Sequence, residues 1–248
     1  MNYVLSKRLR FFLGHLGISC LIAFIILVWV FFIWYPSSLA TAVGVINIFL
    51  LILAIDIIIG PVLGFLVYKE GKKTLKFDLS VIIILQISAL FFGILSIEKG
   101  RPVWLVYNVD RFELVRKNET ITEHLEQVKP QFKQPSWLKP QYIAVEFAKD
   151  KKQREDDMFA EVLGGISIAQ KPERYIDFDH AIPQIKQRAK NVKELEQYND
   201  IQQVQKILHK YPEATGYVPL KANAVDMTVL INKEKGEVVK IVDLRPWK

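Results

Sequence analysis

Residues 11–35 read FFLGHLGISCLIAFIILVWVFFIWY, a stretch of about 25 positions without a charged side chain. At 1.5 Å per helical residue, the stretch exceeds the roughly 30 Å of hydrocarbon in a bilayer. A cleaved signal peptide would also follow basic residues such as Lys7, Arg8 and Arg10, but its apolar region runs to only about 15 residues. The stretch therefore predicts an uncleaved transmembrane helix.

Two more apolar runs follow, at about residues 42–68 and 79–97. Each is long enough to cross a bilayer, although Asp56 and Gly60–Pro61 interrupt the first of them. Residues 98–248 have instead the mixed composition of a soluble domain of ordinary size. We therefore expect a membrane protein in two parts, a three-helix transmembrane domain at residues 1–97 and a soluble domain at residues 98–248.

Basic residues predict the direction of the three spans. They precede the first span (Lys7, Arg8 and Arg10) and fill the loop between the second and third (Lys69, Lys72, Lys73 and Lys76), whereas the turn at residues 36–38 is uncharged. Positive flanks stay in the cytoplasm. We therefore expect a bacterial inner-membrane protein with a cytoplasmic amino terminus and a periplasmic carboxyl-terminal domain.

Strand patterns occur at both ends of the soluble part. The sequence RPVWLVYNVDRFELV, residues 101–115, predicts one strand directly after the third span. Near the end, DMTVLI and EVVKIVDL are joined by NKEKG and predict an antiparallel hairpin over residues 226–244. An α+β domain with an antiparallel sheet follows from these patterns.

Helices are expected between these strands. Residues 146–163 predict one helix, whose apolar face would be formed by Phe147, Met158, Val162 and Leu163. A second helical stretch begins near Pro183 and ends near Tyr211, with a break at Asn199–Asp200. Pro130, Pro135 and Pro140 surround Trp137 and predict extended chain, either a surface loop or a docking segment.

The sequence contains no recognisable catalytic, metal or cofactor motif. The four histidines are scattered, and HExxH, GxSxG and glycine-rich phosphate loops are missing. Cys20, the only cysteine, lies in the first span, so the soluble part forms no disulfide. After position 97, 26 basic and 23 acidic residues are interleaved, which argues against nucleic-acid binding. We expect a protein that is not an enzyme and that has no cofactor.

Asp56 lies near the middle of the second span, where a charged side chain costs at least about 2.5 kcal/mol. Asp56 should therefore face protein and not lipid. Its side chain would form a hydrogen bond either within the chain, to Gln86, Ser88 or His15, or with a polar group of a partner helix. An intramembrane aspartyl protease would need a second acid, and the spans contain none. Gly60 and Pro61 would thin and bend the same helix and let another helix approach. The candidate partner-binding residues are Asp56, Gly60, Pro61, Gln86 and Trp137.

Several of these residues belong to a pattern that resembles the type IV pilin accessory proteins, also described as fimbrial assembly accessory proteins. The resemblance covers about residues 50–115 and consists of DIIIGP at 56–61, KFDL at 76–79, Gln86, Ala89–Leu90, Arg101–Pro102 and VDRF at 109–112. It implies three amino-terminal spans, a periplasmic domain and a role in the biogenesis of type IV pili in Gram-negative bacteria.

The resemblance suggests a chaperone-like protein that holds the pilin subunit in the inner membrane. Asp56 and the Gly60–Pro61 bend would bind the pilin's transmembrane helix, while the outer domain would contact its globular head. The expected partners are therefore pilin and the lipid bilayer, without nucleic acid, and self-association into a homo-oligomer stays open. The alternative is a membrane-anchored sensor or regulatory protein whose periplasmic domain binds a ligand or partner.

Overall fold

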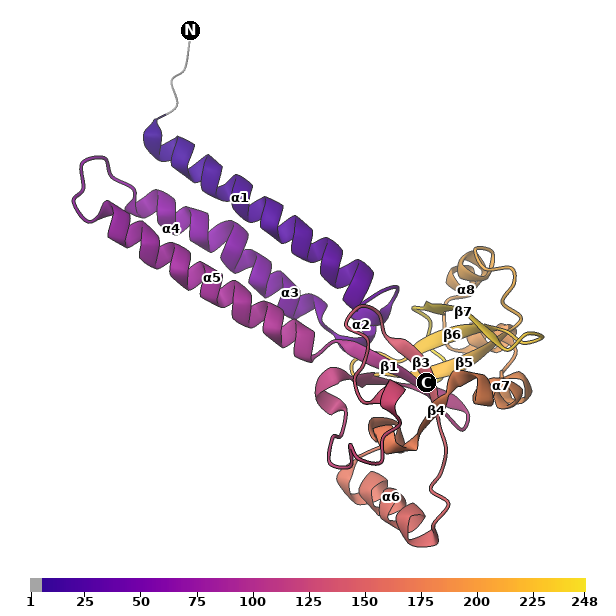
Figure 1. Ribbon diagram of the computed structural model, residues 1–248. Coiled ribbons are helices and arrows are strands. Elements are labelled where there is room, and N and C mark those ends of the chain that lie inside the picture. Colours follow the sequence, from indigo (N-terminus) through magenta and orange to yellow (C-terminus); the bar gives the residue numbers. More distant parts are fainter. Residues whose placement is uncertain (1–5) are drawn as a thin grey trace. The chain divides into compact units, whose positions relative to one another are not determined.

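The structure, a computed structural model, describes residues 6–248 (Figure 1). Residues 1–5, where the expected membrane part begins, lie outside the described residues. By its internal contacts the chain divides into two units. The membrane unit contains the chain up to Phe32 together with Val45–Lys99, and the sheet unit contains Ile33–Gly44 together with Gly100–Lys248.

Three long apolar helical segments form the membrane unit. The first is α1, Lys7–Trp29, which a π-helical turn extends to Trp34. The second consists of α3 (Ile46–Leu53), the π-helical turn η2 (Ala54–Ile59) and α4 (Gly60–Val67). The third is α5, Leu75–Lys99. Each segment has 22 or more residues and is, by its length and composition, apolar enough to cross a membrane, so the three expected long apolar helices are present.

The helices approach one another closely where glycines leave room. An added Cβ on Gly93 would lie 2.6 Å from the Ile52 side chain, and one on Gly64 would lie 3.0 Å from Phe11. Small residues at such contacts let apolar helices pack backbone to backbone. Large apolar side chains such as Phe24, Leu66 and Phe92 are instead exposed on the outside, where lipid would surround them.

The basic segments meet at one end of the membrane unit. Lys7 Nζ lies 3.3 Å from the Glu70 carboxylate. Arg8 donates a hydrogen bond of 2.6 Å to the Phe65 carbonyl, and its guanidinium lies 4.0 Å from the Phe65 ring centroid. The amino-terminal basic residues and the lysine-rich loop therefore share one end of the bundle, as a consistent charge bias requires.

The sheet unit is built on one seven-stranded sheet in the order β4-β3-β1-β2-β5-β6-β7 within residues 6–248. The strands are β1 (Pro102–Asn108), β2 (Arg111–Arg116), β3 (Gln141–Val145), β4 (Tyr175–Asp177), β5 (Gly216–Lys221), β6 (Met227–Asn232) and β7 (Glu237–Val242). Four pairs are antiparallel, and the pairs β1–β3 and β2–β5 are parallel. The expected α+β domain is confirmed, its sheet is largely but not wholly antiparallel, and β6–β7 is the predicted hairpin.

The prediction of a single strand at residues 101–115 was wrong, because this stretch forms a hairpin of β1 and β2. The chain reverses at Val109, whose φ is +57°, a rare conformation for a β-branched residue. Its carbonyl accepts hydrogen bonds from the Tyr107 hydroxyl and from Arg188, both at 2.9 Å. These two contacts hold the turn although it lacks the usual glycine or asparagine.

The main core of the sheet unit includes part of the link between the first two spans. Helix α2, Leu39–Val43, places the fully buried Leu39 and Ala42 among core residues of β1, β2 and β5–β7. The Ala42 carbonyl accepts hydrogen bonds from the Ala224 and Val225 amides at 2.9 and 3.2 Å. Residues 33–44, which the apolar pattern divided between two spans and a short turn, are thus built into the sheet unit.

The helix expected at 146–163 is present as α6, Lys151–Gly164, capped by Asp150 and ended by Gly165 at φ +66°. Its apolar residues do not pack on the core, however. Phe147 before the helix is exposed, as are Met158, Phe159, Val162 and Leu163 on it, and Leu163 is 80% exposed. The side chain that anchors α6 is the buried Asp157. The apolar side of α6 therefore faces outward, so the ordinary expectation for an amphipathic helix fails here.

Two ion pairs bind Asp157 to the rest of the sheet unit. Lys171 Nζ and Arg174 Nε lie 2.6 and 2.8 Å from its carboxylate. Burial acts to raise the pKa of this carboxyl, but hydrogen bonds from Arg174 and Lys171, with their charges, outweigh burial and hold the pKa below its usual range. The carboxylate is thus charged near neutral pH, and its two partners keep it so.

Acid should loosen α6 through Asp157. Because its pKa is lower in the folded state, the stabilisation is complete above the ordinary pKa of about 3.9 and is lost as the pH falls through the lower folded value. We expect Asp157→Asn to destabilise the attachment of α6 by up to about 3 kcal/mol at pH 7 and to abolish its acid sensitivity. Hydrogen exchange of α6 amides between pH 7 and 3 measures the stability of the attachment and its dependence on pH. The control is Asp156→Asn, at the exposed neighbouring residue, which should change neither quantity.

The expected break at Asn199–Asp200 is present, but the second helical stretch is also interrupted earlier, because its first helix ends at Arg188. Helix α7 spans Ile182–Arg188 with Pro183 in its first turn, and α8 spans Ile201–Leu208 with Asp200 as its cap. A 3₁₀ segment, Val192–Gln197, lies between them. The proline-rich segment has a single 3₁₀ turn at Pro130–Phe132 and is otherwise irregular.

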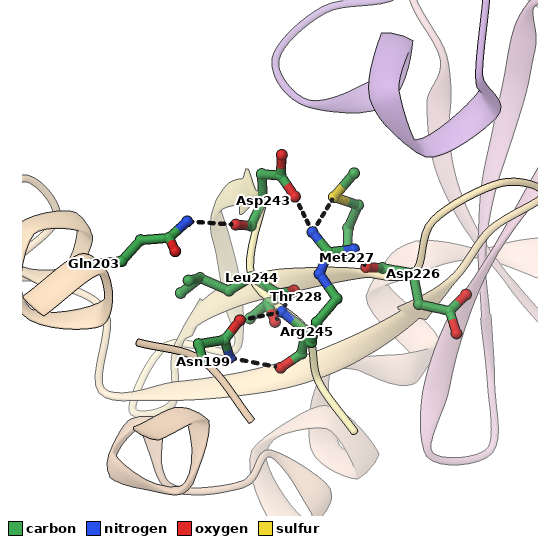
Figure 2. Close-up of polar contacts among 8 residues, drawn as sticks. All are labelled: Asn199, Gln203, Asp226, Met227, Thr228, Asp243, Leu244 and Arg245. Carbon is green, nitrogen blue, oxygen red and sulfur yellow. Dashed lines mark hydrogen bonds and ion pairs between the residues drawn. The ribbon is translucent and has the colours of Figure 1, made fainter. Parts of the chain in front are cut away.

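The last residues are tied to α8 and β6 (Figure 2). Asn199 forms two hydrogen bonds with the Arg245 backbone, at 2.7 and 2.9 Å, and Thr228 donates to the Leu244 carbonyl at 3.0 Å. The Arg245 guanidinium contacts the Asp226 carbonyl and the Asp243 carboxylate. The chain after β7 is therefore held against the sheet. Within residues 6–248, β7 pairs with β6 on one side only.

Candidate functional site

Gln86 is the centre of a polar cluster in the membrane unit. Its amide nitrogen donates hydrogen bonds to the Asp56 carbonyl at 2.8 Å and to the Ser19 hydroxyl at 3.2 Å. Its amide oxygen lies 3.0 Å from His15 Nε2. Because this oxygen can only accept, the hydrogen between the two side chains belongs to His15 Nε2. Four polar residues from three different spans therefore form one network.

Gly60 creates the space that this network needs. A Cβ at position 60 would lie 2.1–2.4 Å from the amide atoms of Gln86, closer than any real contact. Gly60 and Pro61 are both buried and lie at the start of α4, directly after the π-helical turn. The notch over Gly60 is thus filled by the chain's own third span, and a partner helix would have to use another side of the cluster.

An open trough lies beside the cluster. It is a pocket of about 290 Å³, and its apolar lining comes from α1 and α5 (Ile18, Ile22, Ile83, Ile87 and Leu90). Four of these five side chains, all except Leu90, are also exposed on the outer surface, so the trough opens toward the lipid. Its polar lining consists of His15, Ser19, Asp56 and Gln86. The trough therefore offers an apolar groove with hydrogen-bonding groups at its base.

Asp56 is the acidic group of the trough. It is 6% exposed and belongs to the π-helical turn, a feature that occurs often at functional sites. Gln86 contacts Asp56 across the bundle, and no lysine or arginine occurs among the described residues that line the trough. A helix that brings a hydrogen-bond donor or a cation would find a complementary acceptor here.

The structure gathers four of the five candidate residues. Asp56, Gly60, Pro61 and Gln86 lie together in the membrane unit, whereas Trp137 belongs to the sheet unit. There Trp137 is 57% exposed, its carbonyl accepts a hydrogen bond of 3.1 Å from Trp34 Nε1, and the two rings meet edge to face. Of the internal partners considered for Asp56, Gln86 contacts it directly, His15 reaches it through Gln86, and Ser88 faces outward.

Sequence reasoning missed Ser19. The signal was available, because His15 and Ser19 are four residues apart and therefore share one face of a helix. A lone serine in an apolar run is nevertheless unremarkable until the position of Gln86 is known.

Comparison with known proteins gives three relatives that are all fimbrial assembly proteins. A fimbrial assembly protein of Dichelobacter nodosus, serogroup I, is 27% identical over 228 residues, which is 88% of this chain and 88% of the relative. The serogroup E1 protein is 26% identical with the same coverage. The protein of serogroups C1 and C2 is 31% identical over 115 residues, which is 46% of this chain and 88% of the relative.

The chain belongs to the fimbrial assembly protein family. No protein-family model matches it, and no solved structure matches it. The alignments with the serogroup I and E1 proteins extend over most of the chain and most of each relative.

Proposed function

We propose that this fimbrial assembly protein is an inner-membrane accessory protein that binds the pilin subunit and supports type IV pilus biogenesis or dynamics in a chaperone-like, non-enzymatic way. The observation that carries the proposal is the trough beside Asp56, an apolar groove that is open to lipid and has a carboxylate at its base. The relatives are named fimbrial assembly proteins, which supports a role in pilus biogenesis.

The trough suits a transmembrane helix better than a soluble ligand. Isoleucines from α1 and α5 form its two walls, and the second span forms its floor. A pilin subunit waiting in the membrane by its apolar helix could pack laterally between these walls, with one donor group directed at Asp56. Polar contacts between membrane helices contribute about 0.6–2 kcal/mol each, which suits reversible holding.

The proposed topology follows from charge. The end of the bundle at which Lys7 and Glu70 meet would face the cytoplasm, and the sheet unit would lie in the periplasm. The sheet unit would then be on the side where the globular head of a membrane-held pilin is found. The protein would combine two contacts with one pilin, one in the bilayer and one outside it.

Crosslinking in native membranes tests the proposal. A photoreactive side chain at Ile22 or Ile83, in the walls of the trough, should form an adduct with the transmembrane helix of pilin. The same group at Phe92, exposed outside the trough, is the control and should not. Adducts with a receptor or transport complex would favour the sensor alternative, and trough positions that yield no pilin adduct would contradict the proposal.

A further inference from the structure

Two hydrogen bonds attach one turn of the proline-rich segment to the chain where two apolar helices end. Trp34, the last residue of the first long apolar helical segment, donates from Nε1 to the Trp137 carbonyl at 3.1 Å. Arg101, two residues after α5 ends at Lys99, donates from its guanidinium to the Ser136 carbonyl at 2.8 Å. Both contacts lie within the sheet unit. Residues 136 and 137 are therefore held beside two points at which a span would leave the membrane.

This turn presents two large apolar side chains to its surroundings. Trp137 is 57% exposed and Leu138 is 51% exposed. The Leu138 amide donates a hydrogen bond of 3.2 Å to the Ser136 hydroxyl, which closes the turn. Phe132, earlier in the same segment, is buried in a core cluster that contains Trp104 of β1. The segment is therefore anchored to the core through Phe132, while Trp137 and Leu138 remain largely outside it.

The aromatic residues at the end of the first span are covered by protein. Tryptophan and tyrosine are enriched at the boundary between membrane and water, where the ring lies beside lipid and its polar atom stays hydrated. Trp34 and Tyr35 occupy this place in the sequence, but they are only 4% and 1% exposed. The exposed Trp137 ring meets the Trp34 ring edge to face, with the centroids 6.1 Å apart. Trp137 can therefore take the interfacial position that Trp34 and Tyr35 leave.

The charges around the turn are all positive. Lys129, Lys133 and Lys139 are exposed, and residues 127–145 contain no aspartate or glutamate. Anionic lipid headgroups attract lysine side chains that lie near the membrane surface. Large apolar side chains beside such lysines enter the boundary between the headgroups and the acyl chains. The segment thus combines the two properties that a protein surface needs to bind anionic lipid.

We infer that the turn at residues 136–138 lies on the bilayer and that its partner is an anionic phospholipid surface. Trp137 and Leu138 enter the headgroup layer, and the three lysines contact lipid phosphates. The contact limits how far the sheet unit can move away from the lipid. The inference rests on the membrane placement in the proposed function, and it assigns Trp137, a candidate partner-binding residue, to lipid instead of pilin.

Spin labels on the full-length protein test the inference in vesicles that contain no pilin. In a Cys20→Ser background, a nitroxide on the Leu138→Cys variant should be accessible to oxygen, which concentrates in lipid, and protected from a water-soluble paramagnetic reagent. The label on Phe92→Cys, exposed on the outside of α5, is the lipid control. The label on Ile201→Cys, at a residue of α8 that is 52% exposed, is the matched control and should respond as in water.

Vesicle composition distinguishes anionic headgroups from lipid in general. In vesicles that contain phosphatidylglycerol, Lys139→Gln should lower the ratio of protected to unprotected label at position 138 about fivefold, since this is the contribution of one lysine near an anionic surface. Lys210→Gln, at an exposed residue after α8, should leave the ratio unchanged. In vesicles of phosphatidylcholine alone, Lys139→Gln should have no effect. Trp137→Ser should lower the ratio in both kinds of vesicle, although it keeps the backbone carbonyl that Trp34 binds.

Each contrary result identifies the claim that fails. If the label at position 138 responds like the label at position 201, the inference is overturned, whereas pilin capture by the wild type would still support the proposed function. Protection that depends neither on Lys139 nor on lipid charge would overturn the assignment to anionic lipid. Spin–spin broadening at position 138 would show a second copy of this chain in place of lipid. A water response at position 92 would remove the membrane placement, and with it both the inference and the proposed function.

Discussion

Replacing Asp56 with Asn should lower the pilin that co-purifies with the full-length protein about tenfold while the amount of protein in the membrane stays the same. The expected loss corresponds to one polar contact between membrane helices, roughly 1–2 kcal/mol. Asn has nearly the shape of Asp and leaves the Gln86 contact to the backbone carbonyl in place. What it removes is one of the two carboxyl oxygens of residue 56 at the base of the trough, which an amide group replaces.

The effect of Asp56→Asn on the stability of the helix bundle distinguishes a partner-binding role of Asp56 from a purely structural one. A charge among apolar helices costs at least about 2.5 kcal/mol, so Asp56→Asn should leave the bundle as stable as before or make it more stable. A purely structural Asp56 would show the reverse, namely less protein in the membrane. Quantitative blots of membrane fractions beside the co-purification decide between them, and undiminished pilin capture by both Asp56→Asn and Asp56→Leu would remove Asp56 from the mechanism.

Two further substitutions test whether the effect depends on the arrangement around Asp56. Gly60→Ala keeps Asp56 but forces the Gln86 amide to move, because the new Cβ would fall within 2.4 Å of it. We expect a partial loss of pilin capture from this variant. Ser88→Ala, at an exposed position of the same span as Gln86, should have no effect.

Leu39→Ala should destabilise the sheet unit by about 2–5 kcal/mol, although residue 39 precedes the second span in the sequence. Leu39 is 1% exposed and packs in the core that β1, β2 and β5–β7 share. Truncating it removes buried apolar surface and leaves a cavity. Hydrogen exchange of β5 and β6 amides in the detergent-solubilised full-length protein measures the loss.

The matched control is Ile48→Ala, nine residues later on the outside of α3. It removes a side chain of the same size from a surface that detergent covers, so β5 and β6 should exchange as in the wild type. If Leu39→Ala also leaves their exchange unchanged, the link between the first two spans does not stabilise the sheet unit, and its place in the core is contradicted.

Local sequence patterns were sufficient for the elements that do not depend on distant partners. Insertion of a helix into lipid depends on the transfer energies of its own residues, so the uncharged run at residues 11–35 predicted a span by itself. The β6–β7 hairpin joins neighbouring strands through a glycine-ended turn, and α6 carries its own cap at Asp150 and stop at Gly165. In each case the deciding interactions lie within a few residues along the chain.

Turns and faces that depend on tertiary contacts were predicted incorrectly. The β1–β2 reversal at Val109 has no glycine or asparagine in its loop, and it is held by Tyr107 and by Arg188, 79 residues later. The sequence predicted an apolar face for α6 but not the buried Asp157, which attaches the helix because Lys171 and Arg174 compensate its charge. Such compensation is invisible in the periodicity of a single helix.

From the sequence alone came three long apolar helices, the division into apolar and mixed composition, and the choice of Asp56, Gly60, Pro61 and Gln86 as candidate residues. Only the tertiary structure added Ser19 to that set, chose Gln86 and His15 over Ser88, filled the space over Gly60 with Gln86, and placed residues 33–44 in the core of the sheet unit. The reason is physical: hydropathy and capping are properties of a segment, whereas a packed contact requires two segments whose distance along the chain carries no information about their distance in space.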